Sequence, residues 1–132
     1  MTPPDSAAGA DEDQTGTDTY QGFRDALGQE FECTVIREEE RSILKIRGSE
    51  LDLGTEAAVR GPLLALLDEK PPVVLVDAGE LSFIDSSGIG MLVMAQRVAE
   101  NQGTQLLFTG FQAQPLNAIQ ICGLDQIFAI EP

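Results

Sequence analysis

One segment limits the fold of this chain more than any other. Residues 73–77 (Val-Val-Leu-Val-Asp) form an uninterrupted apolar run of strand length, and Pro71-Pro72 directly before it end the preceding segment. A strand with four consecutive apolar residues is expected to be covered on both faces, as the central strands of parallel sheets are. Because parallel strands need crossover connections, usually helices, the chain is predicted to be an α/β protein.

The segments around this run alternate in a way that fits such a sheet. Residues 31–37 and 42–48 are β-rich and joined by a short polar link, which predicts an antiparallel hairpin. The apolar spacing and the glycines at 103 and 123 predict further elements, with helices at about 55–70, 87–101 and 114–122 and strands at 105–109 and 127–130. The predicted fold is a mixed, mainly parallel sheet of roughly four to five strands with an initial hairpin and helices packed on it.

Two residues of the first helix carry specific expectations. Thr55 can cap the N-terminus of this helix through its side-chain oxygen. Pro62 lies within the apolar stripe formed by Val59, Leu63 and Leu66. Because proline removes a backbone donor, a kink or a restart of the helix is predicted at Pro62.

The N-terminal segment differs in composition from the rest of the chain. Residues 1–19 are Pro, Gly, Ala, Thr and acidic residues without a basic one, which predicts a disordered tail. Tyr20, Phe23 and Leu27 fall at helical spacing, so a short helix over residues 20–27 is predicted to end the tail. The chain is therefore divided into an acidic tail, residues 1–28, and one domain, residues 29–132.

The charge and the missing residue types exclude several classes of function. The chain has 22 acidic and 8 basic residues, a formal net charge of −14 and no histidine. Without histidine, no Ser-His-Asp or Cys-His catalytic group can form within the chain, and no catalytic residue, metal site or cofactor is predicted. The negative charge argues against nucleic acid and against anionic membrane surfaces as partners.

The cysteines and the hydropathy indicate a cytoplasmic protein. Its 2 cysteines cannot form a disulfide framework, which fits a reducing compartment. No apolar run is long enough to span a membrane and no secretory signal follows Met1, so direct membrane insertion is not expected. Cys33 and Cys122 have apolar neighbours in the sequence and are expected to pack in the core.

The most informative segment is Leu-Ser-Phe-Ile-Asp-Ser-Ser-Gly-Ile-Gly at residues 81–90, between a predicted strand and a predicted helix. Such junctions carry functional residues in α/β folds. Asp85 or Ser86 can cap the helix, and a serine hydroxyl at this place is accessible and can carry a phosphate, which adds about −1.5 to −2 charges. Arg97 is the only basic residue in 71–132, so this part of the chain offers little positive charge to bind the phosphate. The phosphate is therefore expected to act on a partner.

A simpler interpretation stays open for this segment. In this interpretation Asp85 and the two serines only cap the N-terminus of a helix and have no further function. A nucleophilic serine is not supported, since the segment is not Gly-x-Ser-x-Gly and the chain has no histidine to act as its base.

The first turns of the predicted helix point to contact with another molecule. Gly88 and Gly90 each cost roughly 0.5–1 kcal/mol in a helix relative to alanine, so the close approach of another chain or a ligand explains them better than stability does. Met91 and Met94 belong to a second apolar face, which is typical of a helix buried on one side and bound on the other. The alternative is that both methionines belong to the core.

At the level of longer motifs, residues 73–90 resemble the STAS domain family, specifically bacterial anti-sigma factor antagonists. Residues 84–90 (Ile-Asp-Ser-Ser-Gly-Ile-Gly) resemble the phosphorylation motif of that family, and residues 121–124 resemble its late Ser-Gly-Leu element with cysteine in place of serine. The family's Gly-Glu-Leu-Asp turn is matched by residues 48–52 with one extra residue. The resemblance covers roughly residues 31–131 and implies the STAS fold.

The resemblance also implies a mechanism, in which the chain is not an enzyme but the substrate of one. In the family, the first serine after the aspartate, here Ser86, is phosphorylated by a serine kinase with a histidine-kinase-like fold that is also the anti-sigma factor. The unphosphorylated antagonist binds this kinase and displaces the sigma factor; phosphorylation releases the antagonist, and a PP2C-type phosphatase resets it. The partner-binding residues implied here are Asp52, Asp85, Ser86, Ser87, Gly88, Gly90, Met91 and Met94.

Two other functions are weighed against this one. The first is a soluble STAS subunit or scaffold of a transport or stress-signalling complex, which need not be phosphorylated. The second is a small acidic enzyme that uses Asp85 and Ser86, although the sequence identifies neither a base nor a paired acid for it.

Overall fold

The computed structural model describes residues 16–24 and 30–131 of the chain. A six-stranded sheet has the order β2-β3-β4-β6-β8-β9, and a separate two-stranded sheet joins β5 to β7. β2, β3 and β4 pair antiparallel, whereas β4, β6, β8 and β9 pair parallel. The α/β class, the initial hairpin and the mainly parallel sheet are confirmed, with more strands than predicted.

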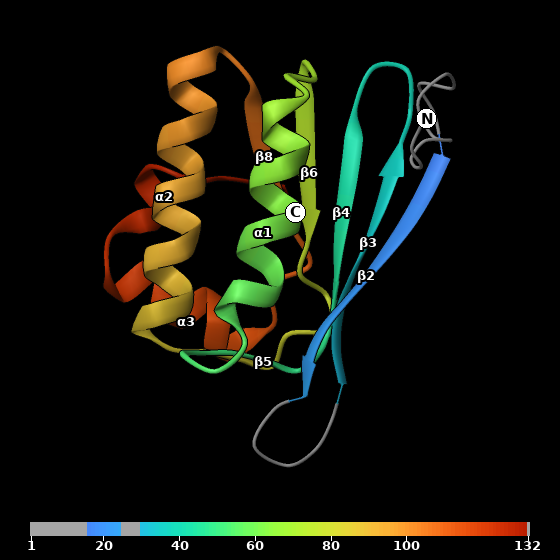
Figure 1. Cartoon of the computed structure of the whole chain (residues 1–132). Helices are drawn as coiled ribbons and strands as arrows, with labels where there is room; N and C mark the ends of the chain where they lie inside the picture. Colours follow the sequence, from blue (N-terminus) through green and yellow to red (C-terminus); the bar gives the residue numbers. More distant parts are fainter. Residues whose placement is uncertain (1–15, 25–29, 132) are drawn as a thin grey trace.

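The bounds of the elements follow the predicted alternation closely. The helices are α1 (Glu56–Asp68), α2 (Ser86–Gln102) and α3 (Ala113–Ile121), followed by the 3₁₀ turn η2 (Leu124–Gln126). The strands are β2 (Gly16–Arg24), β3 (Glu30–Arg37), β4 (Ser42–Arg47), β5 (Glu50–Leu51), β6 (Val73–Asp77), β7 (Phe83–Ile84), β8 (Gln105–Thr109) and β9 (Ala129–Glu131). Figure 1 shows α1 and α2 side by side against the sheet.

The central strand and the hairpin form as the sequence predicts. β6 lies between β4 and β8, and Val74, Leu75 and Val76 are buried. The turn of the β3–β4 hairpin closes with a hydrogen bond from Glu38 N to Arg41 O of 2.8 Å. Burial alternates along β4, so that one face of this strand packs against the helices and the other is partly open to solvent.

The predicted short helix over residues 20–27 is wrong for its first half. Residues 16–24 form β2, which pairs antiparallel with β3 and has a register shift between Gln21 and Phe23. Pairing with the edge of β3 determines the structure of this segment. The helical spacing of its three apolar residues is overridden. The sheet thus begins within the segment assigned to the tail, while residues 1–15 and 25–28 of that tail lie outside the described residues.

The first helix is not interrupted at Pro62. α1 runs without a break from Glu56 to Asp68 and contains this proline. In a regular helix the carbonyl of Ala58 would accept from the residue at position 62, and proline has no N–H to donate. In its place the thiol of Cys33 on β3 donates to Ala58 O, at an Sγ–O distance of 3.6 Å. The predicted restart of the helix is therefore wrong.

The two cysteines differ in their surroundings. Cys33 is fully buried between β3 and α1, as predicted, and burial raises its pKa to about 12, with a smaller contribution from the Glu32 charge. Cys122 is exposed directly after α3, so the expectation that it packs in the core is wrong. The apolar residues next to Cys122 in the sequence do not predict its burial because they lie at the exposed end of a short helix.

Candidate functional site

The candidate site lies where β7 leads into α2. β5 and β7 pair in parallel, Glu50 opposite Phe83 and Leu51 opposite Ile84, and α2 begins two residues after this pairing ends. Neither two-residue strand was predicted. This small sheet brings the turn before α1 next to the start of α2, although the two segments are more than thirty residues apart in the sequence.

Asp85 is the N-cap of α2 and also holds the neighbouring turn. Its Oδ1 atom accepts a hydrogen bond from Gly88 N at 3.0 Å, which satisfies one of the free amides of the first helical turn. Its Oδ2 atom accepts from Leu53 N at 3.3 Å. The sequence left Asp85 and Ser86 as alternative caps of this helix. Asp85 is the cap, and the Ser86 side chain is exposed.

Asp52 organises the turn that approaches Asp85. Its Oδ1 atom accepts hydrogen bonds from Gly54 N at 3.0 Å and from Thr55 Oγ1 at 3.2 Å. The Thr55 hydroxyl lies 2.7 Å from Glu50 O, to which it can also donate, and accepts from Asp52 N at 3.0 Å. α1 does start after Thr55, but the predicted side-chain cap is wrong because this hydroxyl faces β5 and the turn.

The two glycines of α2 have different surroundings. A Cβ atom at Gly88 would lie 2.7 Å from Leu51 O and 2.8 Å from Ile84 Cγ1, so α2 packs directly on β5 and β7 at this position. The close approach predicted for Gly88 therefore occurs within the chain itself. At Gly90 nothing lies within 4 Å of such an atom, and this residue is exposed.

The remaining predicted contact residues divide between the core and the surface. Met91 is only 4% exposed and belongs to the core, which agrees with the alternative considered for the methionines. Ser87 and Met94 are half-buried. Because residues four apart lie on the same face of a helix, Ser86, Gly90 and Met94 form one stripe along α2.

Two exposed apolar side chains next to this stripe were missed by the sequence analysis. Leu53 is 76% exposed and Phe83 is 40% exposed. Leu53 is linked to Asp85 by its amide, and Phe83 precedes Asp85 by two residues. No sequence signal identifies Leu53, since a leucine near a strand is ordinarily expected in the core. We call the group Asp52, Leu53, Phe83, Asp85, Ser86 and Gly90 the Ser86 surface.

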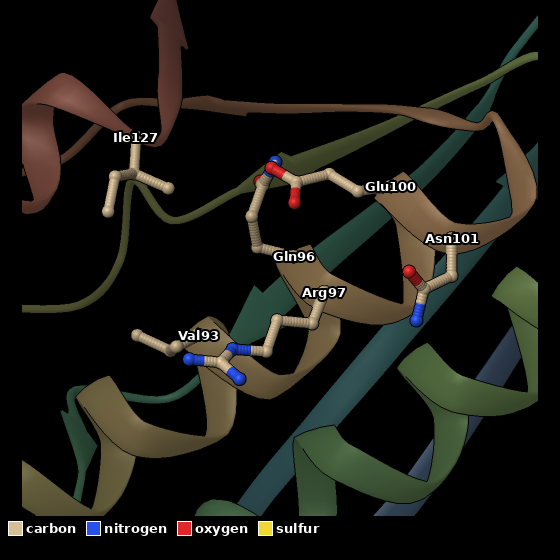
Figure 2. Close-up of a pocket in the computed structure, with 6 residues that line it drawn as sticks. All are labelled: Val93, Gln96, Arg97, Glu100, Asn101 and Ile127. Atoms are coloured by element: carbon tan, nitrogen blue, oxygen red, sulfur yellow. The ribbon is translucent and has the colours of Figure 1, made fainter.

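The arginines of β4 and α1 are paired with glutamates. Arg47 pairs with Glu80 at 3.2 Å, and Arg60 pairs with Glu56 at 3.5 Å. Arg97, on the exposed side of α2, lines a groove of about 420 Å³ together with Glu100, Asn101 and Ile127 (Figure 2). Its side chain points back along the helix toward Val93.

Neither a metal centre nor a membrane span is present in the described part of the chain. Within residues 16–24 and 30–131, no three His, Cys, Asp or Glu side chains are grouped so that they could hold a metal ion. In the same residues no helix combines the length and the apolarity that crossing a bilayer requires. The site consists of the exposed Ser86, Leu53 and Phe83 and the half-buried carboxylates of Asp52 and Asp85.

Comparison with known families decides the family of the chain. Residues 33–131 match the family model described as "Mlab, STAS domain". The chain belongs to the STAS family. The STAS domain thus begins no later than β3 and extends to the end of β9. No curated protein matches the chain.

Solved structures share the fold of this STAS domain. An anti-sigma factor antagonist from Mycobacterium paratuberculosis has a TM-score of 0.64 and 19% identity, over 89% of this chain and 86% of that chain. A sulfate transporter family protein from Wolinella succinogenes has a TM-score of 0.59 and 25% identity, over 70% and 74%. The anti-sigma factor antagonist SpoIIAA of Bacillus, in its unphosphorylated form, has a TM-score of 0.57 and 16% identity, over 76% and 87%.

Proposed function

We propose that this STAS domain is an anti-sigma factor antagonist, a binding module and not an enzyme. In this proposal it binds an anti-sigma factor that is also a serine kinase as long as Ser86 is unphosphorylated, and it thereby frees a sigma factor for transcription. Phosphorylation of Ser86 ends the complex, and a PP2C-type phosphatase restores the binding form. The observation that carries the proposal is the exposed Ser86 hydroxyl at the start of α2, directly after the Asp85 cap.

The surroundings of Ser86 support a modification that controls binding. The side chain is exposed, so a kinase can reach it without unfolding the domain. This serine follows Asp85 directly, Leu53 is hydrogen-bonded to Asp85, and Phe83 precedes Asp85 by two residues. Exposed apolar side chains beside a carboxylate and a hydroxyl suit a protein interface. A relative with the same fold, SpoIIAA, is known in an unphosphorylated and in a phosphorylated form.

The proposed reaction transfers one phosphoryl group. The Ser86 hydroxyl oxygen forms a bond to the γ-phosphorus of ATP, the bond between that phosphorus and the β–γ bridging oxygen breaks, and ADP leaves. The hydroxyl proton goes to a base of the kinase. The product carries about −1.5 to −2 additional charges at neutral pH, next to the Asp85 carboxylate.

A labelling experiment tests the proposed function. The full chain is incubated with ATP and each histidine-kinase-like ATPase encoded in its own genome, and the phosphate is located by mass spectrometry. We expect one ATPase to phosphorylate Ser86, and the label to disappear in Ser86→Ala. Ser82→Ala is the matched control, because Ser82 is an exposed serine of the same connection and its hydroxyl donates to Ser49 O. Phosphorylation at other residues with Ser86 unmodified would contradict the proposal.

A second function keeps specific support. The matching family model carries the description Mlab, and a sulfate transporter family protein shares the fold at 25% identity. Under this alternative the chain is a soluble STAS subunit or scaffold of a transport or stress-signalling complex. Purification of the tagged chain from its own cells distinguishes the two functions: the alternative predicts a stable complex with a transport or stress-signalling assembly and no phosphate on Ser86.

A further inference from the structure

Leu53 combines high exposure with a fixed position. It is 76% exposed, and Ile121 at the end of α3 is equally exposed at 77%. Single exposed apolar residues are common on protein surfaces and need no explanation by themselves. Leu53 differs from Ile121 in its surroundings, because its backbone is hydrogen-bonded to the cap of the helix that presents Ser86.

The turn around Leu53 is held from both sides. Leu53 N donates to Asp85 Oδ2 at 3.3 Å, and Gly54 N donates to Asp52 Oδ1 at 3.0 Å. Thr55 N and Glu56 N both donate to Asp52 O, at 3.1 and 2.8 Å. Because the backbone of such a turn is already fixed, little backbone conformational freedom is lost when a partner buries the side chain it presents, which favours binding.

We propose that Leu53 is the apolar anchor of the Ser86 surface and inserts into an apolar pocket of the kinase. This inference rests on the proposed function and adds the chemistry of the partner's face. Phe83, two residues before Asp85, is 40% exposed and provides a second, smaller apolar contact. Interfaces commonly gain most of their affinity from one or two such side chains that the partner encloses completely.

The charge of the surface determines what surrounds that pocket. The Asp85 and Asp52 carboxylates accept from the amides of Leu53 and Gly54, so both lie at the turn that presents Leu53. The arginines nearest in the sequence to β5 and α1, Arg47 and Arg60, already pair with glutamates. The complementary face of the kinase is therefore an apolar pocket with a rim of lysine or arginine.

The Asp85 carboxylate also connects the anchor to Ser86. Its two oxygens hold Gly88 in the first turn of α2 and Leu53 in the neighbouring turn. A phosphate on Ser86 is attached next to this carboxylate and repels it. Phosphorylation thus adds negative charge directly beside the carboxylate that holds the turn presenting Leu53.

The binding experiment compares two leucine-sized side chains of equal exposure. The kinase that labels Ser86 is titrated with the wild-type chain, Leu53→Ser and Ile121→Ser in a calorimeter. We expect Leu53→Ser to bind about 30-fold more weakly, the loss typical of a central contact, and Ile121→Ser to bind like the wild type. Because both residues are exposed, all three proteins should unfold at the same temperature.

The hydrogen bond to Asp85 is tested without any partner. We expect Asp85→Ala to accelerate amide hydrogen exchange at Leu53 about tenfold, which corresponds to losing one charge-assisted hydrogen bond. The Gly54 amide is the matched control, because its acceptor is Asp52 and does not change.

The outcomes separate this inference from the proposed function. Failure of every ATPase to phosphorylate Ser86 would overturn the proposed function, and the anchor with it. If Ser86 is phosphorylated but Leu53→Ser binds the kinase as tightly as the wild type, the anchor is wrong and the proposed function stands. Unchanged exchange at Leu53 in Asp85→Ala would show that Asp85 does not hold the anchor.

Discussion

Alanine substitutions at the two glycines of α2 should change stability in opposite directions. Both Gly88 and Gly90 lie in the same helix, so each replacement gains roughly 0.5–1 kcal/mol of helix propensity. At Gly90 the new methyl group meets open space, and the gain is expected in full. At Gly88 it meets Leu51 O at 2.7 Å and Ile84 Cγ1 at 2.8 Å. Neither the strand carbonyl nor a buried isoleucine can move away cheaply.

The size of the effect follows from the difference between the two variants. Overpacking of this kind lowers the free energy of unfolding by about 1–3 kcal/mol. The gain in helix propensity is the same in both variants, so it cancels when the two alanine variants are compared. Gly88→Ala should therefore be about 2 kcal/mol less stable than Gly90→Ala. With a urea slope of about 2 kcal/mol per M, the midpoints should differ by about 1 M. Equal midpoints in urea unfolding of the full chain would refute the close packing of α2 on β5 and β7.

Three further predictions concern the cap and the thiols. Asp85→Ala should destabilise the domain by about 1 kcal/mol through the lost N-cap, measured by thermal unfolding. At pH 8 a thiol reagent should modify the exposed Cys122 quickly and the buried Cys33 only after denaturation; equal rates would contradict the burial. Since burial raises the Cys33 pKa from 9.0 to about 12, the unfolded chain loses this proton first, and stability should fall as the pH rises from 9 toward 12. Cys33→Val should lack that part of the pH dependence in urea titrations.

The sequence predicted the elements that have strong periodicity or clear termination signals. β6 was identified by its continuous apolar run, and the end of α2 by Gly103, which adopts a left-handed φ of 80°. The two-residue strands β5 and β7 were not predicted, because two residues show no period. These short strands nevertheless position the site, so its geometry depends on the elements with the weakest sequence signal.

Pro62 shows why a local rule can fail in a folded domain. The sequence correctly indicates that a backbone carbonyl in α1 loses its partner, and it cannot indicate that a thiol from β3 replaces that partner. The replacement needs a protonated thiol, and burial raises the Cys33 pKa from 9.0 to about 12, so the thiol stays protonated well above neutral pH. A side chain from β3 thus partners the carbonyl that Pro62 leaves without its helical donor.

The sequence located the segments of the candidate site but not the surroundings of each residue. Ser86, Asp85 and Asp52 were identified by motif and lie close together through the turn at Leu53. Gly88 and Met91 were expected on the partner side and are buried within the domain. A helical pattern of apolar residues does not say which of two apolar faces meets the sheet, and only the packing of α2 on β5, β7 and β8 decides it.

The positions of the arginines relative to Ser86 indicate whether a phosphate there would act within the domain or on a partner. Arg97 lies 11 residues further along α2. At 1.5 Å per residue, that places it roughly 16 Å from Ser86 along the helix axis. Arg47 is already paired with Glu80. The new charge would face the Asp85 carboxylate and solvent, and its interaction with surface cations at that distance is largely screened. A phosphate that gains little from its own domain can change binding only through the partner, which favours release over an internal rearrangement.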